Sequence, residues 1–363
     1  MEITLQQYQD SLNKKIKHSA EMFKQINVPF HLSIVFAVYN EIERMKPKKE
    51  SSVGEDSIRV KVSQLNELFS NTNKGTWTIY IVDDGCPYNS GKFAEEIANT
   101  LPERDQIKVL YLNQAIKQNL PPIKTLTNTS ESKKGGAILY GMWQAKEDNK
   151  NRKNHVVIFT DADTSTDLRQ SGLLIDKIIN KNYITVIGSR RAKDSCVIKT
   201  GIRNTRGKLF IYLWKQLLSP CLKNIADTQC PFKAFNANYI DKLVSNNIEF
   251  QFAFDIELLL KTEIIDKKRL QKIGIAWKDS TIASTVGGNE TYLDMLKSIA
   301  NMYRYYNTPS SWSNEYADFV ENLTLKDLDK LIDNTPKYIS ETDPIEFEPK
   351  ISVNDLKRII KAY

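Results

Sequence analysis

Two aspartates stand directly after an apolar run, at positions suited to binding a divalent cation. Asp161, Ala162 and Asp163 follow the run HVVIFT at 155–160. Two carboxylates separated by one residue beyond the end of a strand can turn toward one ion, and oxygen ligands select Mg²⁺ or Mn²⁺. A metal held there would neutralise the charge of a diphosphate as it departs. The same residues, with Thr164 next to them, are also typical of a turn and a helix N-cap.

The spacing of the histidines and cysteines argues against a zinc site. The three histidines form no HxxxH or HExxH pattern, and the four cysteines form no CxxC pair. Such pairs are the usual framework of a zinc site. We therefore expect oxygen ligands for any metal and reduced thiols.

A second acidic pair, Asp83 and Asp84, follows the apolar run at 77–82. A carboxylate there can accept hydrogen bonds from a ribose or a base, and a simple Asp-Gly turn is the alternative. Lys134 and Gly135 open a predicted helix, where a glycine lets the backbone and a lysine approach phosphate. The GxxxxGK[ST] spacing of a P-loop is missing, and a tight helix start is the alternative.

Four arginines in the middle of the chain can bind phosphate, because a guanidinium group makes two parallel hydrogen bonds to it. A solvated basic face is the alternative. The four residues are Arg190, Arg191, Arg203 and Arg206.

The segment 227–233 (DTQCPFK) mixes an acid, an amide and a cation with apolar neighbours. Buried polar groups need partners, so this mixture indicates a site. Asp255 and Glu257 begin a predicted helix, where acids are favoured even without a function. If the reaction needs a base, Asp227 or Asp255 would supply it, and we favour Asp227.

The elements that would position these residues alternate between strand-like and helix-like segments. Near-continuous apolar runs predict strands buried on both faces at 31–39, 77–82, 107–112, 155–160 and 183–187. Apolar residues three and four positions apart predict helices at 58–69, 92–99, 135–146 and 168–179. The alternation predicts an α/β fold with a doubly wound, mostly parallel sheet and helices on both faces. Such sheets bind ligands at the carboxyl ends of their strands, where these polar residues lie.

Three parts are expected along the chain, with exposed loops predicted at 46–56 and 118–133. The parts are an N-terminal helical segment at 1–30, the α/β domain at 31–285 and a C-terminal helical extension at 286–363.

Composition and charge narrow the class of protein. The chain has 363 residues, with 51 Lys and Arg against 44 Asp and Glu, and a formal net charge of +7. Residues 311–363 carry 7 basic and 11 acidic side chains, which leaves a net charge of +11 on residues 1–310. This surplus favours an anionic partner. A non-enzymatic basic module that binds an anionic membrane or nucleic acid ranks lowest, because no RNA- or DNA-reading motif is present; we expect no nucleic-acid partner.

The sequence predicts neither a membrane-spanning helix nor a secretory signal. No stretch approaches the roughly 18 apolar residues that a spanning helix needs, and residues 1–15 lack the apolar core of a secretory signal. We therefore expect a cytoplasmic protein, with peripheral contact at a membrane surface as an option. The apolar stretch 209–222 fits either a helical core, which we favour, or a helix in a membrane interface.

Taken in order, eight motifs resemble the family 2 glycosyltransferases of the GT-A fold. Within that family, the chain looks most like the branch of dolichyl-phosphate β-glucosyltransferase and dolichyl-phosphate mannose synthase, over about residues 31–285. The motifs are AVYNE (37–41), VDDG (82–85), KGGA (134–137), DAD (161–163), GSR (188–190), RN (203–204), DTQCPFKAF (227–235) and FDIELL (254–259).

The resemblance implies an inverting transfer from a nucleotide-diphosphate sugar, for which we favour UDP-glucose. It implies that Tyr39, Glu41 and Asp83 lie near the nucleoside, and that Asp161 and Asp163 lie at the metal and the diphosphate. The complete set expected to bind the nucleotide sugar is Tyr39, Glu41, Asp83, Asp84, Lys134, Gly135, Asp161 and Ala162.

For the acceptor, the resemblance implies a phosphate that faces Arg190 and Arg203, with Lys233 close by. A phosphate monoester has a second pKa of about 6 and is therefore a ready nucleophile that needs little base catalysis. We favour a phosphorylated acceptor, of which polyprenyl phosphate is one form. Transfer to a protein or glycan hydroxyl is the alternative, and it would need Asp227 or Asp255 as the base.

Overall fold

The computed structural model describes residues 3–198, 204–280, 288–306 and 310–362. The chain forms two compact units. The sheet unit comprises Met1–Lys199 and Gln229–Ile282, and the helical unit comprises Thr200–Thr228 and Ala283–Tyr363. The sequence-based bounds placed residues 200–228 in the α/β domain, whereas these residues belong to the helical unit.

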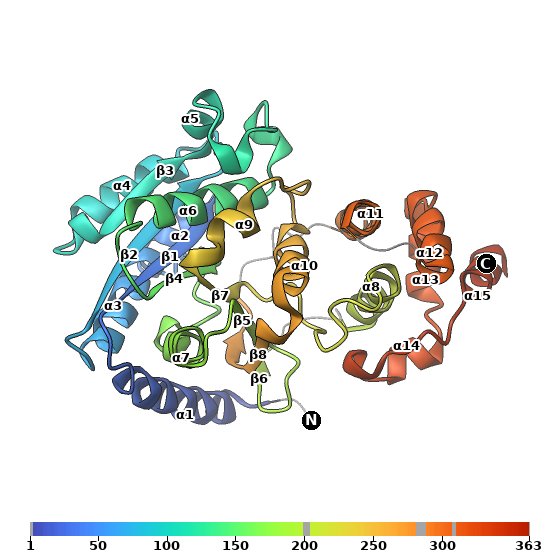
Figure 1. Cartoon of the computed structure of the whole chain (residues 1–363), viewed down its shortest axis with the longest axis horizontal. Coiled ribbons are helices and arrows are strands. Elements are labelled where there is room, and N and C mark those ends of the chain that lie inside the picture. The colour runs from blue at the N-terminus through green and yellow to red at the C-terminus, as the bar shows by residue number, and fades with distance from the viewer. Residues whose placement is uncertain (1–2, 199–203, 281–287, 307–309, 363) are drawn as a thin grey trace. The chain divides into compact units, whose positions relative to one another are not determined.

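The sheet unit is built on seven strands in the order β3-β2-β1-β4-β7-β5-β8 (Figure 1). All neighbouring pairs are parallel except the two that β7 makes with β4 and β5. The strands are β1 (Phe30–Val38), β2 (Gly75–Asp83), β3 (Ile107–Tyr111), β4 (His155–Thr160), β5 (Thr185–Ser189), β7 (Phe232–Asn236) and β8 (Leu270–Gly274). A separate two-stranded sheet pairs β6 (Cys196–Ile198) with β9 (Ala276–Lys278) in parallel.

Alternate residues of the central strand β1 pack into two different apolar layers. Leu32, Ile34 and Phe36 belong to one cluster, and Val35 belongs to the other. The first cluster includes side chains from α1 (Leu5–Lys24), α3 (Ser57–Phe69), α4 (Ser90–Asn99) and α7 (Gly172–Lys181). The second includes side chains from α5 (Leu112–Lys117), α6 (Gly135–Asp148), α9 (Ile240–Val244) and α10 (Phe254–Asp266). Helices therefore cover both faces of the sheet, as the apolar runs predicted.

Short elements complete the sheet unit. They are α2 (Ile42–Met45) and the 3₁₀ turns η1 (Arg104–Gln106), η2 (Pro121–Ile123), η3 (Thr129–Glu131), η4 (Leu168–Ser171), η5 (Ala237–Tyr239) and η6 (Lys267–Arg269). The predicted loop at 46–56 lies between α2 and α3, and the predicted loop at 118–133 contains η2 and η3.

The strand order reverses between β1 and β4. From β1, the chain proceeds through β2 to β3 on one side, and β4 pairs with β1 on the other side. Ligands of open α/β sheets bind where the strand order reverses in this way. The segments after β1 and β4, which carry Glu41 and Asp161, therefore flank this position.

The helical unit is organised around α8 (Asn204–Leu217), whose side chains Leu209, Leu213 and Trp214 are fully buried. The helix packs against four others of its own unit, and the Tyr212 hydroxyl donates to the Ile351 carbonyl at 3.1 Å. The apolar stretch 209–222, most of which lies in α8, thus contributes to a helical core, as we predicted from the sequence. The other elements of the unit are α11 (Asn289–Tyr306), α12 (Ser311–Glu321), α13 (Leu325–Asp333), α14 (Lys337–Glu341), η7 (Pro344–Glu346) and α15 (Val353–Ala362). Among the described residues of the whole chain, no helix combines the length and apolarity needed to span a bilayer.

Candidate active site

The turn after β4 carries the two aspartates that the sequence singled out. Ala162 between them is buried, and Asp163 accepts a hydrogen bond from the backbone N–H of Ser165 at 3.0 Å. The Lys61 ammonium, on α3, donates to the carbonyl of Asp163. The expected turn is therefore present, and it is fixed by contacts from outside its own segment.

Burial and the neighbouring charge of Asp161 raise the pKa of Asp163, while Lys61 opposes the shift. Two carboxylates that repel each other in this way favour a cation between them. No group of three His, Cys, Asp or Glu side chains arranged to hold a metal occurs among the described residues. The pair fits Mg²⁺ or Mn²⁺, because such an ion uses one or two carboxylates and completes its shell with phosphate oxygens and water.

Lys134 brings a cation to the same place. Its ammonium forms an ion pair with Asp161. Burial has the largest single effect and lowers the pKa of Lys134, but the charge and hydrogen bond of Asp161, together with the charges of Asp255 and Asp163, make the net shift upward. Lys134 has φ of +79°, and a Cβ on Gly135 would lie 2.6 Å from the carbonyl carbon of Phe250. The glycine thus permits the close backbone approach at the start of α6.

The acidic pair after β2 holds loops in place. Asp83 accepts backbone N–H bonds from Gly85, Cys86 and Gly91 at 2.9, 2.8 and 2.7 Å. These bonds order the turn between β2 and α4. A contact between Asp83 and a nucleoside stays a prediction.

Asp84 connects the turn after β2 to Lys134, the residue directly before α6. It accepts hydrogen bonds from the Ser132 hydroxyl at 2.6 Å and from the backbone N–H of Lys134 at 2.7 Å. Burial raises the pKa of Asp84 to about 6, although both hydrogen bonds act in the opposite direction. Asp84 therefore positions Lys134 rather than presenting a free carboxylate.

The segment after β1 presents one exposed aromatic ring and one buried acid. Tyr39 is 50% exposed, which leaves its ring available to stack on a planar ligand. Both carboxylate oxygens of Glu41 accept from the same nitrogen of Arg44, Nη1, at 2.8 and 2.6 Å. Burial raises the pKa of Glu41 to about 7, and Arg44 opposes the shift.

Lys233 and Asp255 form a buried ion pair, with the Lys233 ammonium 3.0 Å from the carboxylate. Lys233 is 0% exposed and also donates to the Cys230 carbonyl at 2.6 Å, while Gln229 donates to Asp255 at 2.5 Å. Burial raises the pKa of Asp255 against these contacts. The two predicted catalytic residues thus contact each other directly, and a contact of either with substrate stays a prediction.

The other residues predicted to act on the sugar acceptor lie in different parts of the chain. The Arg190 guanidinium lies over the Trp277 ring, 5.2 Å from its centre. Arg203 lies outside the described residues. Asp227 is buried and belongs to the helical unit. The sheet unit therefore brings Asp161, Asp163 and Lys134 together, and the roles of the acceptor residues stay predictions.

Two residues that contact the turn after β4, Lys61 and Glu55, were not predicted from the sequence. Lys61 lies three residues after Ile58 and four before Leu65 on the buried face of α3, so a lysine within that periodic face was a readable signal. Glu55 binds the backbone of Thr164 from the polar loop 46–56, where no periodicity marks it.

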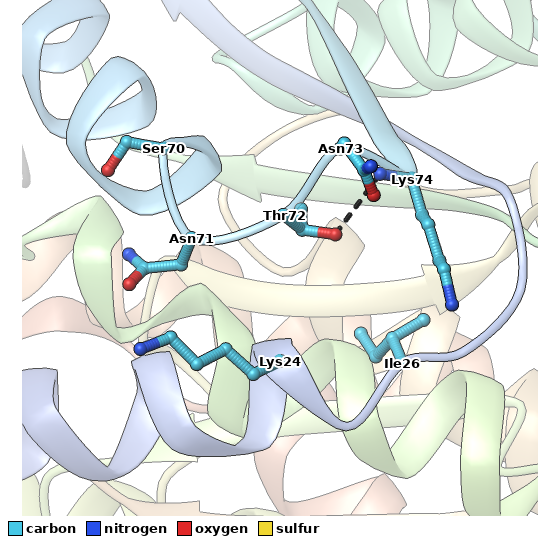
Figure 2. A pocket seen from close by; sticks show the side chains of 7 residues that line it. All are labelled: Lys24, Ile26, Ser70, Asn71, Thr72, Asn73 and Lys74. Atoms are coloured by element: carbon cyan, nitrogen blue, oxygen red, sulfur yellow. Dashed lines mark hydrogen bonds between the residues drawn. The ribbon is translucent and has the colours of Figure 1, made fainter.

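A pocket of about 410 Å³ lies at the other end of the strands, and Figure 2 shows the side chains that line it. Its lining includes Ile26, shortly before β1, and Lys74, directly before β2. It contains none of the predicted site residues. The full lining is Lys24, Ile26, Ser70, Asn71, Thr72, Asn73 and Lys74.

Comparison with solved structures supports the fold. The chain matches glucosyl-3-phosphoglycerate synthase from Mycobacterium tuberculosis, solved with Mn²⁺, UDP-glucose and phosphoglyceric acid, with a TM-score of 0.53 and 14% identity over 82% of this chain and 85% of that one. It matches mannosyl-3-phosphoglycerate synthase from Rubrobacter xylanophilus with a TM-score of 0.52 and 12% identity over 85% and 82%. These likenesses confirm the predicted GT-A fold.

Comparison of sequences supports the family. A dolichyl-phosphate beta-glucosyltransferase of Trichomonas vaginalis is 26% identical over 268 residues, 70% of each chain. The dolichyl-phosphate beta-glucosyltransferase of Homo sapiens is 23% identical over 256 residues, 68% of this chain and 67% of the human one. The family model for glycosyl transferase family 2 matches residues 33–244. The chain therefore belongs to glycosyl transferase family 2.

Proposed function

We propose that the chain transfers glucose, with inversion, from UDP-glucose to a phosphorylated acceptor, and that this acceptor is a polyprenyl phosphate. The carrying observation is the group formed by Asp161, Asp163 and Lys134 beside the carboxyl end of β4, where the strand order reverses. The names of the similar curated proteins, dolichyl-phosphate beta-glucosyltransferases, support the choice of glucose and of a lipid phosphate.

The donor end of the site supplies charge where the diphosphate leaves. Asp161 and Asp163 would hold Mg²⁺ or Mn²⁺, which when bound neutralises charge on the departing diphosphate. Lys134 lies beside Asp161 and is fixed through its backbone by Asp84, so its ammonium can contact the same phosphates. Tyr39 is exposed next to β1 and can stack on the base. This arrangement stabilises the leaving group without a proton transfer.

At the acceptor end, an oxygen of the acceptor phosphate attacks C1 of glucose from the face opposite to the diphosphate. The new C1–O bond forms as the C1–O bond to the diphosphate breaks, and UDP leaves with the bonding electrons. The acceptor phosphate, with a second pKa of about 6, is largely dianionic at neutral pH and needs no base. Arg190 is our candidate for holding it, because guanidinium groups bind phosphate in two-point contacts.

The environment of Asp255 favours a phosphate acceptor over a hydroxyl. A hydroxyl acceptor needs a base whose carboxylate can reach it, but both oxygens of Asp255 accept hydrogen bonds, one from Gln229 and one from Lys233. Asp227 is then the remaining base for the alternative reaction. Asp227→Asn should leave transfer to a phosphate largely unchanged and abolish transfer to a hydroxyl.

The test is a transfer assay with labelled UDP-glucose, Mn²⁺ and two matched lipids, dolichyl phosphate and dolichol, which differ only in the phosphate. GDP-mannose serves as the control donor, and 3-phosphoglycerate as a water-soluble phosphorylated acceptor. We expect label in dolichyl phosphate alone. Equal labelling of dolichol would contradict the phosphate acceptor, and labelling of 3-phosphoglycerate alone would contradict the lipid.

A further inference from the structure

Glu55, near the end of the loop 46–56, contacts the turn that carries the two aspartates. Its Oε2 accepts hydrogen bonds from the backbone N–H and the hydroxyl of Thr164, both at 2.8 Å. Its Oε1 accepts from the Ser280 hydroxyl at 2.5 Å. The side chain is only 13% exposed, so one carboxylate bridges the segments after β4 and β9 inside the sheet unit.

The same carboxylate is linked to the segment after β1. The Arg44 Nε lies 3.8 Å from the Glu55 carboxylate, and its Nη1 lies 2.6 Å from the Glu41 carboxylate. The Arg44 side chain is 10% exposed. Charges buried to this degree cost free energy unless they are paired, so the acids and the arginine depend on one another. The connection Glu41–Arg44–Glu55–Thr164 therefore joins the segments after β1 and β4, between which the strand order reverses.

The loop that presents Glu55 is closed by its own backbone. The N–H of Glu55 donates to the Arg44 carbonyl at 2.9 Å, and that of Asp56 donates to the Lys46 carbonyl at 3.0 Å. At Gly54, a Cβ would lie 2.4 Å from the Lys46 carbonyl oxygen, so only glycine permits this closure. Backbone hydrogen bonds thus hold the two ends of the loop together and fix the backbone position of Glu55.

A cation also contacts this turn. The Lys61 ammonium is 0% exposed, donates to the Asp163 carbonyl and lies 5.5 Å from the centre of the Phe36 ring. A cation from α3 therefore contacts Asp163, and an anion from the loop contacts Thr164. Two fixed contacts on adjacent residues leave little freedom for the carboxylate of Asp163.

We propose that Glu55 is a positioning residue: it fixes the turn 161–164 and so holds Asp161 and Asp163 in the arrangement that binds the metal and the donor diphosphate. This inference rests on the proposed function, because it takes these two aspartates as the ligands. Its consequence is that the loop 46–56, far in sequence from the aspartates, controls affinity for the metal and the donor.

Glu55→Gln is the test, because it keeps the size of the side chain and removes its charge. Glu50→Gln is the matched control: Glu50 lies in the same loop, its side chain is 55% exposed, and it forms an ion pair with Lys49 at 3.8 Å. Three quantities are measured for each protein: the exchange rate of the Thr164 amide hydrogen by NMR, the dissociation constant for Mn²⁺ with UDP present, and KM against kcat for UDP-glucose.

In Glu55→Gln, we expect faster Thr164 exchange, roughly tenfold weaker Mn²⁺ binding and a similarly raised KM, because a hydrogen bond to a charged group is lost. Glu50→Gln should match the wild type in all three. A variant that loses only thermal stability, with Mn²⁺ affinity and KM unchanged, overturns the positioning role.

The readouts separate this inference from the proposed function. If the wild type binds neither Mn²⁺ nor UDP-glucose, the proposed function fails, and the positioning role for metal and donor fails with it. If the wild type binds both but Thr164 exchange is the same in Glu55→Gln, the proposed function stands and the positioning role is overturned.

Discussion

Lys134 illustrates how one residue serves both the structure and the chemistry of the site. Its positive φ lets the chain turn into α6, its backbone N–H is held by Asp84, and its ammonium pairs with Asp161. An ammonium at this place balances the carboxylate until the phosphates of a donor arrive. The residue could be selected from the sequence because it stands beside a glycine at a helix start.

Lys233 is a residue whose position the sequence left open. The motif DTQCPFK indicated buried polar groups with partners, and the structure pairs Lys233 with Asp255 on a different element. Spacing along the chain could not reveal this pair, because the two residues meet only when β7 and α10 pack together.

The buried pair gives a prediction about stability. Lys233→Met leaves Asp255 without its cation in a buried position, so the free energy of unfolding should fall by about 3–5 kcal/mol. Adding Asp255→Asn removes the unpaired charge and should recover part of that loss. Urea denaturation of the wild type, both single variants and the double variant measures the coupling; strictly additive losses would contradict the pairing.

At the scale of elements, the five strands predicted from apolar runs are all present, whereas the separate pair formed by the short strands β6 and β9 was not foreseen. The strands β6 and β9 have three residues each, too few for any periodic pattern. The antiparallel strand β7 was missed because its sequence FKAFN places a lysine inside the core, which a pattern of apolar residues does not predict.

The pairing of β1 with β4 places two histidines side by side, His31 opposite His155. Burial lowers the pKa of His31 to about 3, and the positive charges of His155 and Arg152 add to the effect. Burial, with Arg152, lowers the pKa of His155 to about 4. Both rings are therefore neutral in the folded protein at pH 5.

This pair predicts how stability changes with pH. In the unfolded chain, histidine takes up a proton below about pH 6.5, whereas in the folded chain it does so only near pH 3–4. The stabilising contribution is thus complete above pH 6.5 and is lost as the pH falls. Between pH 7 and pH 5, each histidine should cost up to about 2 kcal/mol of unfolding free energy.

The test is the loss of unfolding free energy between pH 7 and pH 5, measured by denaturant unfolding for the wild type and for His31→Asn. The variant should lose less stability on acidification than the wild type. His18→Asn is the matched control, because the His18 side chain is 58% exposed. Equal losses in wild type and His31→Asn would show that His31 is not responsible.

At the scale of the whole molecule, the chain folds as two units that interleave along the sequence. The family match over residues 33–244 includes α8, although α8 belongs to the helical unit. The sequence predicted a C-terminal helical extension from residue 286, but it could not show that residues 200–228 join it, because that depends on which helices α8 packs against.

Because the helical unit combines residues 200–228 with the C-terminal helices, we expect that removing those helices destabilises the protein. A chain ending at residue 286 lacks the partners of α8, and burial of each large apolar side chain contributes about 1.5–3 kcal/mol. Leu209, Leu213 and Trp214 are fully buried in the full chain. We expect the shortened chain to bind a hydrophobic dye and to aggregate in sedimentation runs; a monomer with wild-type melting behaviour would contradict this.

The net positive charge of residues 1–310 bears on the class of protein. Membership of a transferase family argues against a non-enzymatic basic module. The surplus is consistent with a protein that binds the phosphates of a donor and of an acceptor.

The central claim, that the aspartates after β4 bind a nucleotide sugar through a metal, is tested most directly by calorimetric titration of UDP-glucose in the presence and absence of Mn²⁺. The wild type should bind only with Mn²⁺, and Asp163→Ala should bind more than about tenfold more weakly. Asp105→Ala, whose native side chain is 95% exposed, should bind as the wild type does. Equal affinity in Asp163→Ala and the wild type would contradict the claim.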